Sequence, residues 1–374
     1  MTTALLSRSW WIAYRDQLLG KSQFLRFAIR FPLTRPIARH RANRLFDLCA
    51  GFVYSQILLA CIRLRLFELL ADGPRSASVL ADAMSLSLED ARRLLRAAVS
   101  LELVAQRGDD GFSLGVLGSA LLANPGVAAM VEHHSLLYRD LADPVALLRR
   151  QGDPSLARYW PYAERERASL PDAAIHPYST LMAQSQSLIV DDVLAAYSLA
   201  PHRRLLDVGG GDGHFAAAVA RRWPHLDVAV FDLPAVAERA RARFAKEGIA
   251  AAAVGGDFAK DELPRGADVI TLIRVAHDHD DAALVALFRS VCGALPPHGA
   301  LVLAEPMSGT RGGERIADAY FGLYLLAMRS GRPRTPQELT RLLTAAGFDS
   351  VRGVPTRMSN LVRVLVATPA ATSK

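Results

Sequence analysis

The sequence predicts an α/β protein in which a doubly wound, Rossmann-like sheet follows an N-terminal winged-helix domain. Apolar strands alternate with amphipathic helices from residue 204 onwards, and a glycine-rich turn follows the first of these strands. Before residue 123 the pattern is instead helical, with one short hairpin. Alternation of the first kind is typical of a parallel sheet covered by helices on both faces.

The glycine-rich turn joins a strand at residues 204–208 to a helix at residues 215–223. Asp207 lies near the end of the strand, and three glycines stand at alternate positions after it: Gly209, Gly211 and Gly213. Glycines let the backbone approach a ligand closely and adopt dihedral angles that a Cβ forbids. We therefore expect a nucleotide site at this turn.

The spacing favours S-adenosylmethionine over a dinucleotide as the ligand. A dinucleotide fingerprint has the pattern G-x-G-x-x-G, whereas here an acid, Asp207, opens the motif. An acid suits a cationic ligand with a free amino group. A second acid, Asp232, ends the next strand, where doubly wound sheets receive the hydroxyls of a ribose. A dinucleotide or an emptied site is the alternative.

Later strand ends carry further candidates. Asp257 and Phe258 follow a strand at residues 250–254 and offer adenine an acceptor and a flat apolar wall; a loop acid beside a core phenylalanine is the alternative. His277 follows a buried strand, and Glu305 ends the next one. Because ligands of open α/β sheets lie at strand carboxyl ends, we expect His277 in the crevice with Glu305 nearby.

A histidine beside a carboxylate suits proton abstraction near neutral pH. With a sulfonium donor and no serine or cysteine nucleophile, this pair predicts methyl transfer to a hydroxyl group. His277 and the acids that follow it are also a possible metal site: Asp278, Asp280 and Asp281. We prefer no metal, because consecutive acids after a strand also cap the next helix, here at residues 282–295.

Composition predicts two domains in a chain of 374 residues that is 51% hydrophobic. The longest uncharged apolar stretch, residues 51–62, falls short of the roughly 18 residues of a spanning helix, so we expect a buried helix there. The three cysteines are odd in number and do not have the spacing of metal ligands, which indicates a reducing compartment. Arginines interrupt the N-terminus, unlike a cleavable signal.

The net charge of +7 resides in the first fifty residues, which hold nine lysines and arginines and two acids. Aromatic residues alternate with these cations. Such a mixture suits the surface of an anionic bilayer, and packing on the chain itself or on a partner subunit is the alternative. Pro32 and Pro36 are expected to break this arm before the folded body begins.

Residues 45–123 predict a winged helix, with helices at 78–84 and 88–100 and a hairpin turning at 107–111. Ser87 is expected to cap the second of these helices. DNA binding is disfavoured because Glu89 and Asp90 would repel phosphate at the start of the reading helix. Dimerisation through an apolar helix at residues 46–70 is preferred.

The expected organisation is therefore a basic amphipathic arm at residues 1–44, a winged-helix dimerisation domain at 45–123, connecting helices at 124–186 and a Rossmann-like domain at 187–374. His133 and His134 are expected to be ordinary surface or core residues, and His279 has no assigned role.

Six motifs in order resemble the S-adenosylmethionine-dependent O-methyltransferases of the plant caffeate and acetylserotonin type: residues 206–213, 231–234, 256–258, 274–278, 304–305 and 334–335. The resemblance implies that His277 is the base, flanked by Glu305 and Asp278, and that the chain forms a homodimer. It implies cofactor contacts from Asp207, Gly209, Gly211, Gly213, Asp232, Leu233, Asp257, Phe258 and Arg274. It implies acceptor contacts from Tyr178, Met182, Tyr320, Tyr324 and Met328.

Two departures from the family pattern concern the base. His279 stands where the family usually has tryptophan, and Pro333 stands where plant members place a second glutamate. The base is therefore expected to be held by fewer acids than in plant members of the family. Some members of the family have also lost methyl transfer.

The basic arm and residues 31–39, 46–70 and 124–134 resemble the carotenoid branch of this family. That resemblance implies a hydrophobic acceptor, the tertiary 1-hydroxyl of an acyclic hydroxycarotenoid, and a cytoplasmic enzyme peripheral on the photosynthetic membrane. A polyketide phenol or a bacteriochlorophyll precursor is the alternative acceptor. A winged-helix DNA-binding or ligand-sensing protein with a vestigial cofactor site is the alternative of another class.

Overall fold

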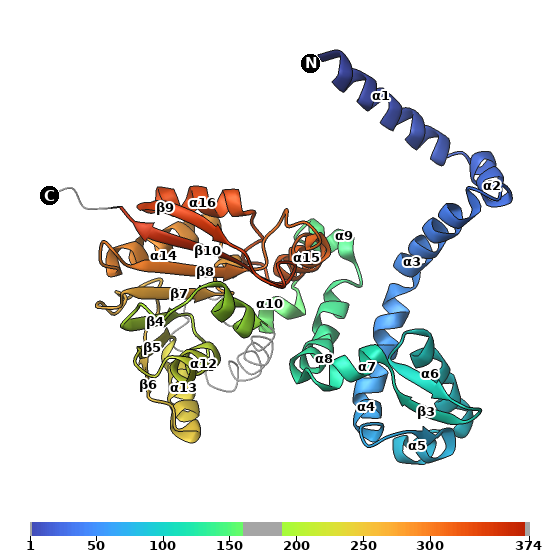
Figure 1. The fold of residues 1–374 in the computed structure, drawn as a ribbon, viewed down its shortest axis with the longest axis horizontal. Coiled ribbons are helices and arrows are strands. Elements are labelled where there is room, and N and C mark those ends of the chain that lie inside the picture. The colour runs from blue at the N-terminus through green and yellow to red at the C-terminus, as the bar shows by residue number, and fades with distance from the viewer. Residues whose placement is uncertain (1, 160–188, 371–374) are drawn as a thin grey trace. The chain divides into compact units, whose positions relative to one another are not determined.

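The computed structural model describes residues 2–159 and 189–370, and its contacts divide the chain into two compact units, Met1–Leu122 and Ala123–Lys374 (Figure 1). Tyr178 and Met182, which we expected to contact the acceptor, lie outside the described residues, as does the expected boundary at 186/187.

The first unit begins with helices α1 (Thr2–Leu19), α2 (Ser22–Arg30) and α3 (Arg35–Arg63). The chain turns between α2 and α3, but Pro36 lies in the first turn of α3, where its missing N–H breaks no hydrogen bond. Pro36 thus starts a helix, contrary to the expectation that it ends one. Helix α3 also crosses residue 44, so the arm has no structural end there.

The expected helix at residues 51–62 is present as part of α3, but its burial is confirmed only near its end, at Leu59 and Cys61. Only 11% of the most apolar 18-residue window of α3 is buried, and Phe52 is 66% exposed. By length and composition, α3 is the one helix among the described residues that passes as membrane-spanning. The helix expected over 46–70 is also interrupted, because Arg65 adopts a left-handed conformation (φ 56°) before α4 (Leu66–Leu69).

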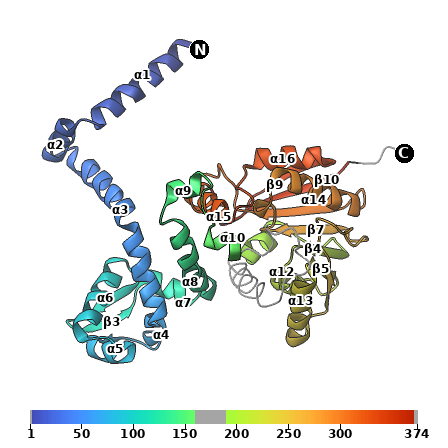
Figure 2. The same ribbon diagram turned by 180° about the vertical axis from the view of Figure 1, so that it is seen from behind.

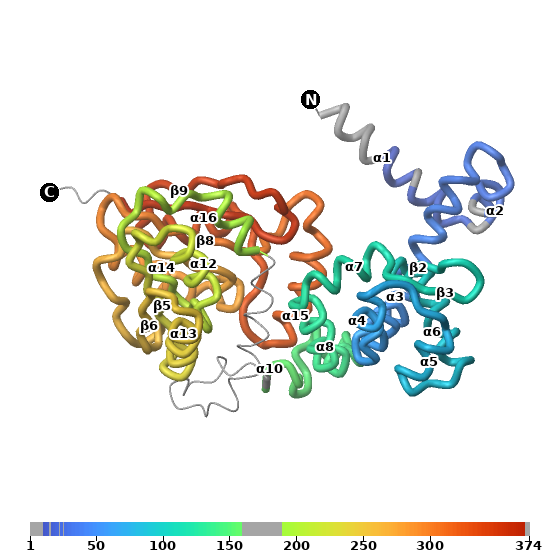
Figure 3. The backbone as a smooth tube through the Cα atoms, turned by 60° about the horizontal axis from the view of Figure 1, so that its bottom comes forward, coloured from blue at the N-terminus to red at the C-terminus, as the bar shows by residue number. Residues whose placement is uncertain are grey.

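The rest of the first unit is the expected winged helix, drawn as a tube in Figure 3. Helices α5 (Ala77–Met84) and α6 (Leu88–Ser100) precede the hairpin of β2 (Val104–Arg107) and β3 (Gly111–Leu114), to which β1 (Arg75–Ser76) adds a third strand; α7 (Val116–Leu122) follows. Ser87 caps α6 by accepting from the Asp90 amide at 3.1 Å. At the start of α6, Arg93 pairs with Glu89 and Asp90.

The second unit contains a seven-stranded sheet with the order β6-β5-β4-β7-β8-β10-β9. Its strands are β4 (Arg204–Val208), β5 (Asp227–Asp232), β6 (Ala251–Gly255), β7 (Val269–Ile273), β8 (Ala300–Glu305), β9 (Phe348–Val354) and β10 (Arg363–Pro369). Neighbours from β6 to β8 pair in parallel, whereas β10 runs antiparallel to both β8 and β9. This confirms the predicted doubly wound sheet.

Helices cover both faces of the sheet, as Figures 1 and 2 show. One apolar core joins the strands to α12 (His214–Arg222) and α13 (Pro234–Glu247), and the other joins them to α14 (Asp281–Ala294) and α16 (Pro336–Ala345). The sequence order reverses between the neighbouring strands β4 and β7. Ligands of open α/β sheets bind at such a switch point, so the loops after these strands face the expected site.

A smaller helical cluster of the same unit contains α8 (Pro125–Asp140), α9 (Pro144–Leu148), α10 (Ser155–Tyr159), the π-helix η4 (Arg315–Phe321) and α15 (Gly322–Ala327). It joins residues that are nearly two hundred positions apart in sequence. Local patterns in the sequence therefore do not predict that these helices pack together.

Candidate active site

The glycine turn after β4 has the backbone that its sequence predicts. Gly209, Gly211 and Gly213 all have positive φ, at 69°, 61° and 79°. A Cβ on Gly213 would lie 2.5 Å from the Phe244 ring, whereas a Cβ on Gly211 would meet no atom within 4 Å. Gly213 therefore serves helix packing, while Gly211 borders open space that a ligand can enter.

Two acids from neighbouring strands flank this turn. Asp207 Oδ1 accepts from the Thr271 hydroxyl at 2.6 Å, while its Oδ2 is buried without a hydrogen-bond partner among the described residues. Asp232 accepts from the amides of Gly211, at 2.8 Å, and Leu233, at 2.7 Å. Burial raises the pKa of Asp207 to about 7 and that of Asp232 to about 6. Two desolvated carboxyl groups at one turn fit a ligand that brings a cation and hydroxyl groups.

A third acid follows β6. Asp257 is buried, and its Oδ1 accepts from the Ala259 amide at 3.0 Å. Its Oδ2 has no hydrogen-bond partner in the described parts of the chain, although Lys260 Nζ lies 3.6 Å away. Phe258 is half-buried, with its ring edge-on to His279 at a centroid distance of 5.3 Å. His279, for which the sequence suggested no role, thus contacts the expected adenine wall.

The predicted base lies in a short 3₁₀ turn, η3 (Ala276–Asp278), after β7. Its Nδ1 contacts Glu305 Oε2 at the end of β8, and its Nε2 lies 3.2 Å from Asp278 Oδ1. The other oxygen of Glu305 accepts from the amides of Val275, at 3.0 Å, and Ala276, at 2.7 Å. Glu305 is 2% exposed, so this buried carboxylate fixes both the imidazole and the turn that carries it.

Electrostatics favour a more basic imidazole than that of an exposed histidine. Burial alone lowers the pKa of His277, but the carboxylates of Glu305 and Asp278 more than reverse this, and the pKa is raised overall. Burial also raises the pKa of Asp278 to about 6, against the opposing effect of His277. Asp278, which the family motif shares, thus supplies a second carboxylate to the base. The expectation of fewer acids than in plant members rests on Pro333 and stays a prediction.

An apolar pocket of about 160 Å³ adjoins this constellation. Phe321 lines it, and its ring is tilted by 54° against the His277 ring at a centroid distance of 5.5 Å. Pro306, which follows Glu305, lines it too. The remaining lining residues are Gly126, Val127, Met130, Ile189, Arg274, Ile316, Tyr320 and Leu361. This wall is assembled from five separate segments, 126–130, 189, 274, 306–321 and 361, so only the structure could reveal it.

The expected acceptor residues divide in two. Tyr320 lines the pocket, whereas Tyr324 and Met328 are buried in the helical cluster and do not line it. Arg274, expected at the cofactor, lines the apolar pocket and stacks 5.8 Å from the Phe321 ring.

The two histidines on α8 pair with these tyrosines. His133 Nε2 contacts the Tyr324 hydroxyl at 2.9 Å, and His134 Nε2 contacts the Tyr320 hydroxyl at 2.8 Å. Burial, assisted by His134, lowers the pKa of His133 to about 4, so this imidazole is neutral at physiological pH. The His134–Tyr320 pair joins α8 to the π-helix η4, which lines the pocket, and the His133–Tyr324 pair joins α8 to α15.

Family models match most of the chain. An O-methyltransferase domain covers residues 138–349, and an O-methyltransferase dimerisation domain covers residues 46–124. The chain belongs to the O-methyltransferase family. It is therefore an S-adenosylmethionine-dependent O-methyltransferase that forms homodimers, and the exposed apolar surface of α3 lies partly in its dimerisation domain.

Curated relatives of this methyltransferase include demethylspheroidene O-methyltransferases. That of Cereibacter sphaeroides is 44% identical, with 91% of this chain and 90% of the relative covered. That of Rhodobacter capsulatus is 41% identical, with 86% and 81% covered.

The structure of human N-acetylserotonin methyltransferase in complex with S-adenosylmethionine is 26% identical and superposes with a TM-score of 0.74, covering 88% of this chain and 98% of the human one. The same cofactor fits the present chain, because buried carboxylate oxygens of Asp207 and Asp257 lack hydrogen-bond partners among the described residues, and Gly211 after Asp207 borders open space.

Proposed function

We propose that this methyltransferase methylates the tertiary 1-hydroxyl of an acyclic hydroxycarotenoid. The observation that carries the proposal is the buried His277–Glu305–Asp278 cluster next to an apolar pocket, in a chain whose relatives at 44% and 41% identity are named for demethylspheroidene. A pocket of about 160 Å³ has about half the volume of the smallest typical pockets for a drug-sized ligand, about 300 Å³. It suits one end of a long acceptor rather than the whole molecule.

In the proposed mechanism, Glu305 accepts the Nδ1–H of His277, which leaves the lone pair of Nε2 to act as base. The acceptor hydroxyl loses its proton to Nε2, and Asp278 stabilises the imidazolium. S-adenosylmethionine, when bound, would supply the methyl group to the acceptor oxygen, with its sulfur–methyl bond breaking and the neutral thioether as leaving group. Because a tertiary alcohol is far less acidic than a phenol, a strongly held base matters more here.

We propose that the cofactor is held by Asp207, Asp232 and Asp257. The unpartnered Oδ2 of Asp207 suits its amino group, Asp232 suits the ribose, and Asp257 with Phe258 suits the adenine. Among the glycines, Gly211 borders the open space, and Leu233 fixes the Asp232 carboxylate through its amide.

The acceptor is tested by offering labelled S-adenosylmethionine with a 1-hydroxycarotenoid in detergent, and in parallel with a phenol. We expect label in the carotenoid and a loss of about 10²–10⁴-fold in turnover in His277→Ala, with the cofactor affinity retained. Transfer to the phenol but not to the carotenoid contradicts the proposed acceptor. Full turnover by His277→Ala contradicts the proposed base.

We further propose that the segment before α3 contacts an anionic membrane, which places a cytoplasmic enzyme at the photosynthetic membrane where a polyene dissolves. Trp10 and Trp11 are 59% and 63% exposed and Phe27 is 58% exposed, among arginines that suit phosphate headgroups. No acid occurs between Asp16 and Asp47 to oppose that attraction.

Sedimentation with vesicles tests this contact. The full chain should bind vesicles rich in phosphatidylserine more than neutral ones, and a chain lacking residues 1–34, which keeps α3 whole, should not bind. A shortened chain that binds equally well, or that falls apart into monomers, would assign the segment to subunit packing. A gel shift at physiological salt tests the remaining alternative, because DNA binding through phosphates weakens steeply with salt.

We propose the winged helix at residues 45–123 as the dimerisation domain and residues 187–374 as the catalytic domain, with the helices at 124–186 between them. The contact division at residue 122 and the family model for residues 46–124 support this organisation.

A further inference from the structure

A short segment after α15 contacts the turn that carries His277 along its whole length. The four successive carbonyls of residues 276–279 all accept hydrogen bonds from residues 330–334. Ser330 Oγ donates to Asp278 O at 2.5 Å, and the Arg332 amide donates to His277 O at 2.9 Å. Within the turn itself Ala276 O accepts from the His279 amide at 3.4 Å, a long contact, and residues 330–334 add a donor to this carbonyl and to each of the next three.

Arg334 makes the two outer contacts. Its Nη1 donates to Ala276 O at 3.0 Å and its Nη2 donates to His279 O at 2.7 Å, so one planar guanidinium spans the turn. Arg334 is 2% exposed, although arginine is rarely buried without a partner. Its charge is balanced by Asp281, whose Oδ1 lies 2.8 Å from Nε.

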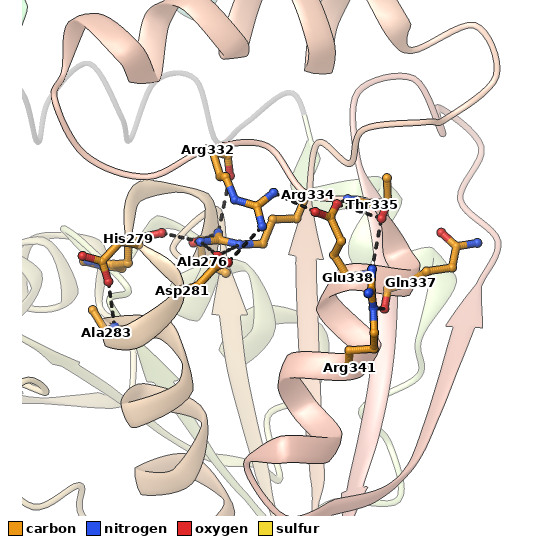
Figure 4. Close-up of polar contacts among 11 residues, drawn as sticks. Ala276, His279, Asp281, Ala283, Arg332, Arg334, Thr335, Gln337, Glu338 and Arg341 are labelled. Atoms are coloured by element: carbon orange, nitrogen blue, oxygen red, sulfur yellow. Dashed lines mark hydrogen bonds and ion pairs between the residues drawn. The ribbon is translucent and has the colours of Figure 1, made fainter. Parts of the chain in front are cut away.

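Neighbouring groups hold Arg334 in place, as Figure 4 shows. Arg332 bridges the other oxygen of Asp281, at 3.0 Å, and Glu338, at 2.8 Å. Glu338 also closes a capping box with Thr335 at the start of α16. The Arg334 guanidinium is therefore bound directly to Asp281 in the first turn of α14, and through Asp281 and Arg332 it is linked to Glu338 in the first turn of α16.

The fit around Gly331 is close. Gly331 has φ of 73°, and a Cβ there would lie 1.9 Å from His277 O. Only glycine permits both this backbone and this approach. Backbone, hydroxyl and guanidinium donors from one segment therefore fix the turn at successive positions.

We propose that Arg334 is a positioning residue for the base, and that residues 330–334 hold His277 in line between Glu305 and Asp278. Two anchors then act on the same turn: Glu305 holds the amides of Val275 and Ala276, and Arg334 holds the carbonyls on the opposite side. This inference rests on the proposed role of His277.

Loss of the two hydrogen bonds from Arg334 to Ala276 O and His279 O should lower turnover without changing cofactor binding. Misplacement of a reacting group by about 1 Å costs about 10²-fold, so we expect Arg334→Gln to lower kcat by about 10- to 100-fold at unchanged cofactor Kd. Arg334→Lys keeps the charge near Asp281 but cannot donate to both carbonyls in the same geometry. Its kcat should therefore lie between those of the wild type and Arg334→Gln.

The pH dependence of kcat separates positioning from a general loss of stability. The two carboxylates raise the pKa of His277, so a turn that no longer holds the imidazole between them should shift the acid limb of kcat to lower pH. Arg341→Gln is the matched control, because Arg341 is exposed on α16 and, within the described parts of the chain, its side chain donates to Gln337 O of its own helix and not to the 276–279 turn. It should leave kcat and the acid limb unchanged.

Ser330→Ala keeps the proposal testable if Arg334→Gln does not fold, because it removes only the hydroxyl donor to Asp278 O. It should lower kcat and shift the acid limb in the same direction, with a smaller amplitude. Wild-type kcat and pH profile in folded Arg334→Lys and Ser330→Ala would overturn the proposal. His277→Ala is measured alongside. Full turnover in that variant contradicts the proposed base, whereas an inactive His277→Ala together with unaffected Arg334 and Ser330 variants contradicts only the positioning role of residues 330–334.

Discussion

Asp207→Asn should make the cofactor-free protein more stable at alkaline pH and less able to bind its cofactor. Asp207 is 1% exposed, and burial raises its pKa from 3.8 to about 7. Three pKa units correspond to about 4 kcal/mol, an upper bound on the cost of ionising this carboxyl in the folded state. Asparagine keeps the size and still accepts from Thr271, but it buries one unpartnered amide, which costs about 1–3 kcal/mol.

The sign of the pH dependence follows from linkage. A group whose folded pKa is raised contributes stability below its unfolded pKa, and that contribution is lost as the pH rises through the folded pKa. The wild type should therefore lose stability relative to Asp207→Asn between about pH 4 and pH 7. Asp232 and Asp278 titrate in the same range, so the informative quantity is the difference between the two proteins.

Urea unfolding of the dimer at fixed protein concentration, from pH 5 to pH 8, measures that difference. We expect the free energy of unfolding of Asp207→Asn to exceed that of the wild type by about 1–3 kcal/mol at pH 8. Calorimetric titration with S-adenosylmethionine should show affinity at least tenfold weaker in the variant. Parallel stability curves would show that Asp207 ionises normally in the fold, and unchanged affinity would remove it from the cofactor site.

Three further predictions concern the site and its support. Glu305→Gln should lower kcat about 100-fold, measured by methyl transfer, and move its acid limb to lower pH because His277 loses a carboxylate. Gly213→Ala should lower the unfolding free energy by about 2–3 kcal/mol, and Gly211→Ala by only about 1 kcal/mol, because only the first adds a clash to the strain of positive φ. Tyr324→Phe should lower the free energy of unfolding in urea by about 1 kcal/mol, since it removes the hydroxyl bound to a buried histidine. Equal stability of Gly213→Ala and Gly211→Ala would contradict the argument from the clash, and equal stability of Tyr324→Phe and the wild type would contradict the argument from the hydrogen bond.

Local signals in the sequence determined the doubly wound sheet and the positions of Asp232, Asp257, His277 and Glu305. Each of these residues ends or follows an apolar strand, and the geometry of parallel strands brings such ends to one edge. The caps of α6 and α14 were equally predictable, because Ser87 and Asp280 act within one helical turn. In each of these predictions, the interactions that decide the local structure lie within about ten residues of chain.

The tertiary structure alone decided which groups surround the base and which surfaces stay exposed. Contact between Arg334 and residues 276–279 spans more than fifty positions, and the pairs of His133 and His134 with their tyrosines span nearly two hundred. Hydrophobic periodicity carries no information on such partners, because it reports which face is apolar and not what covers it. For the same reason the apolar stretch of α3 suggested burial, whereas the chain by itself leaves it exposed and a dimerisation domain gives that surface a use.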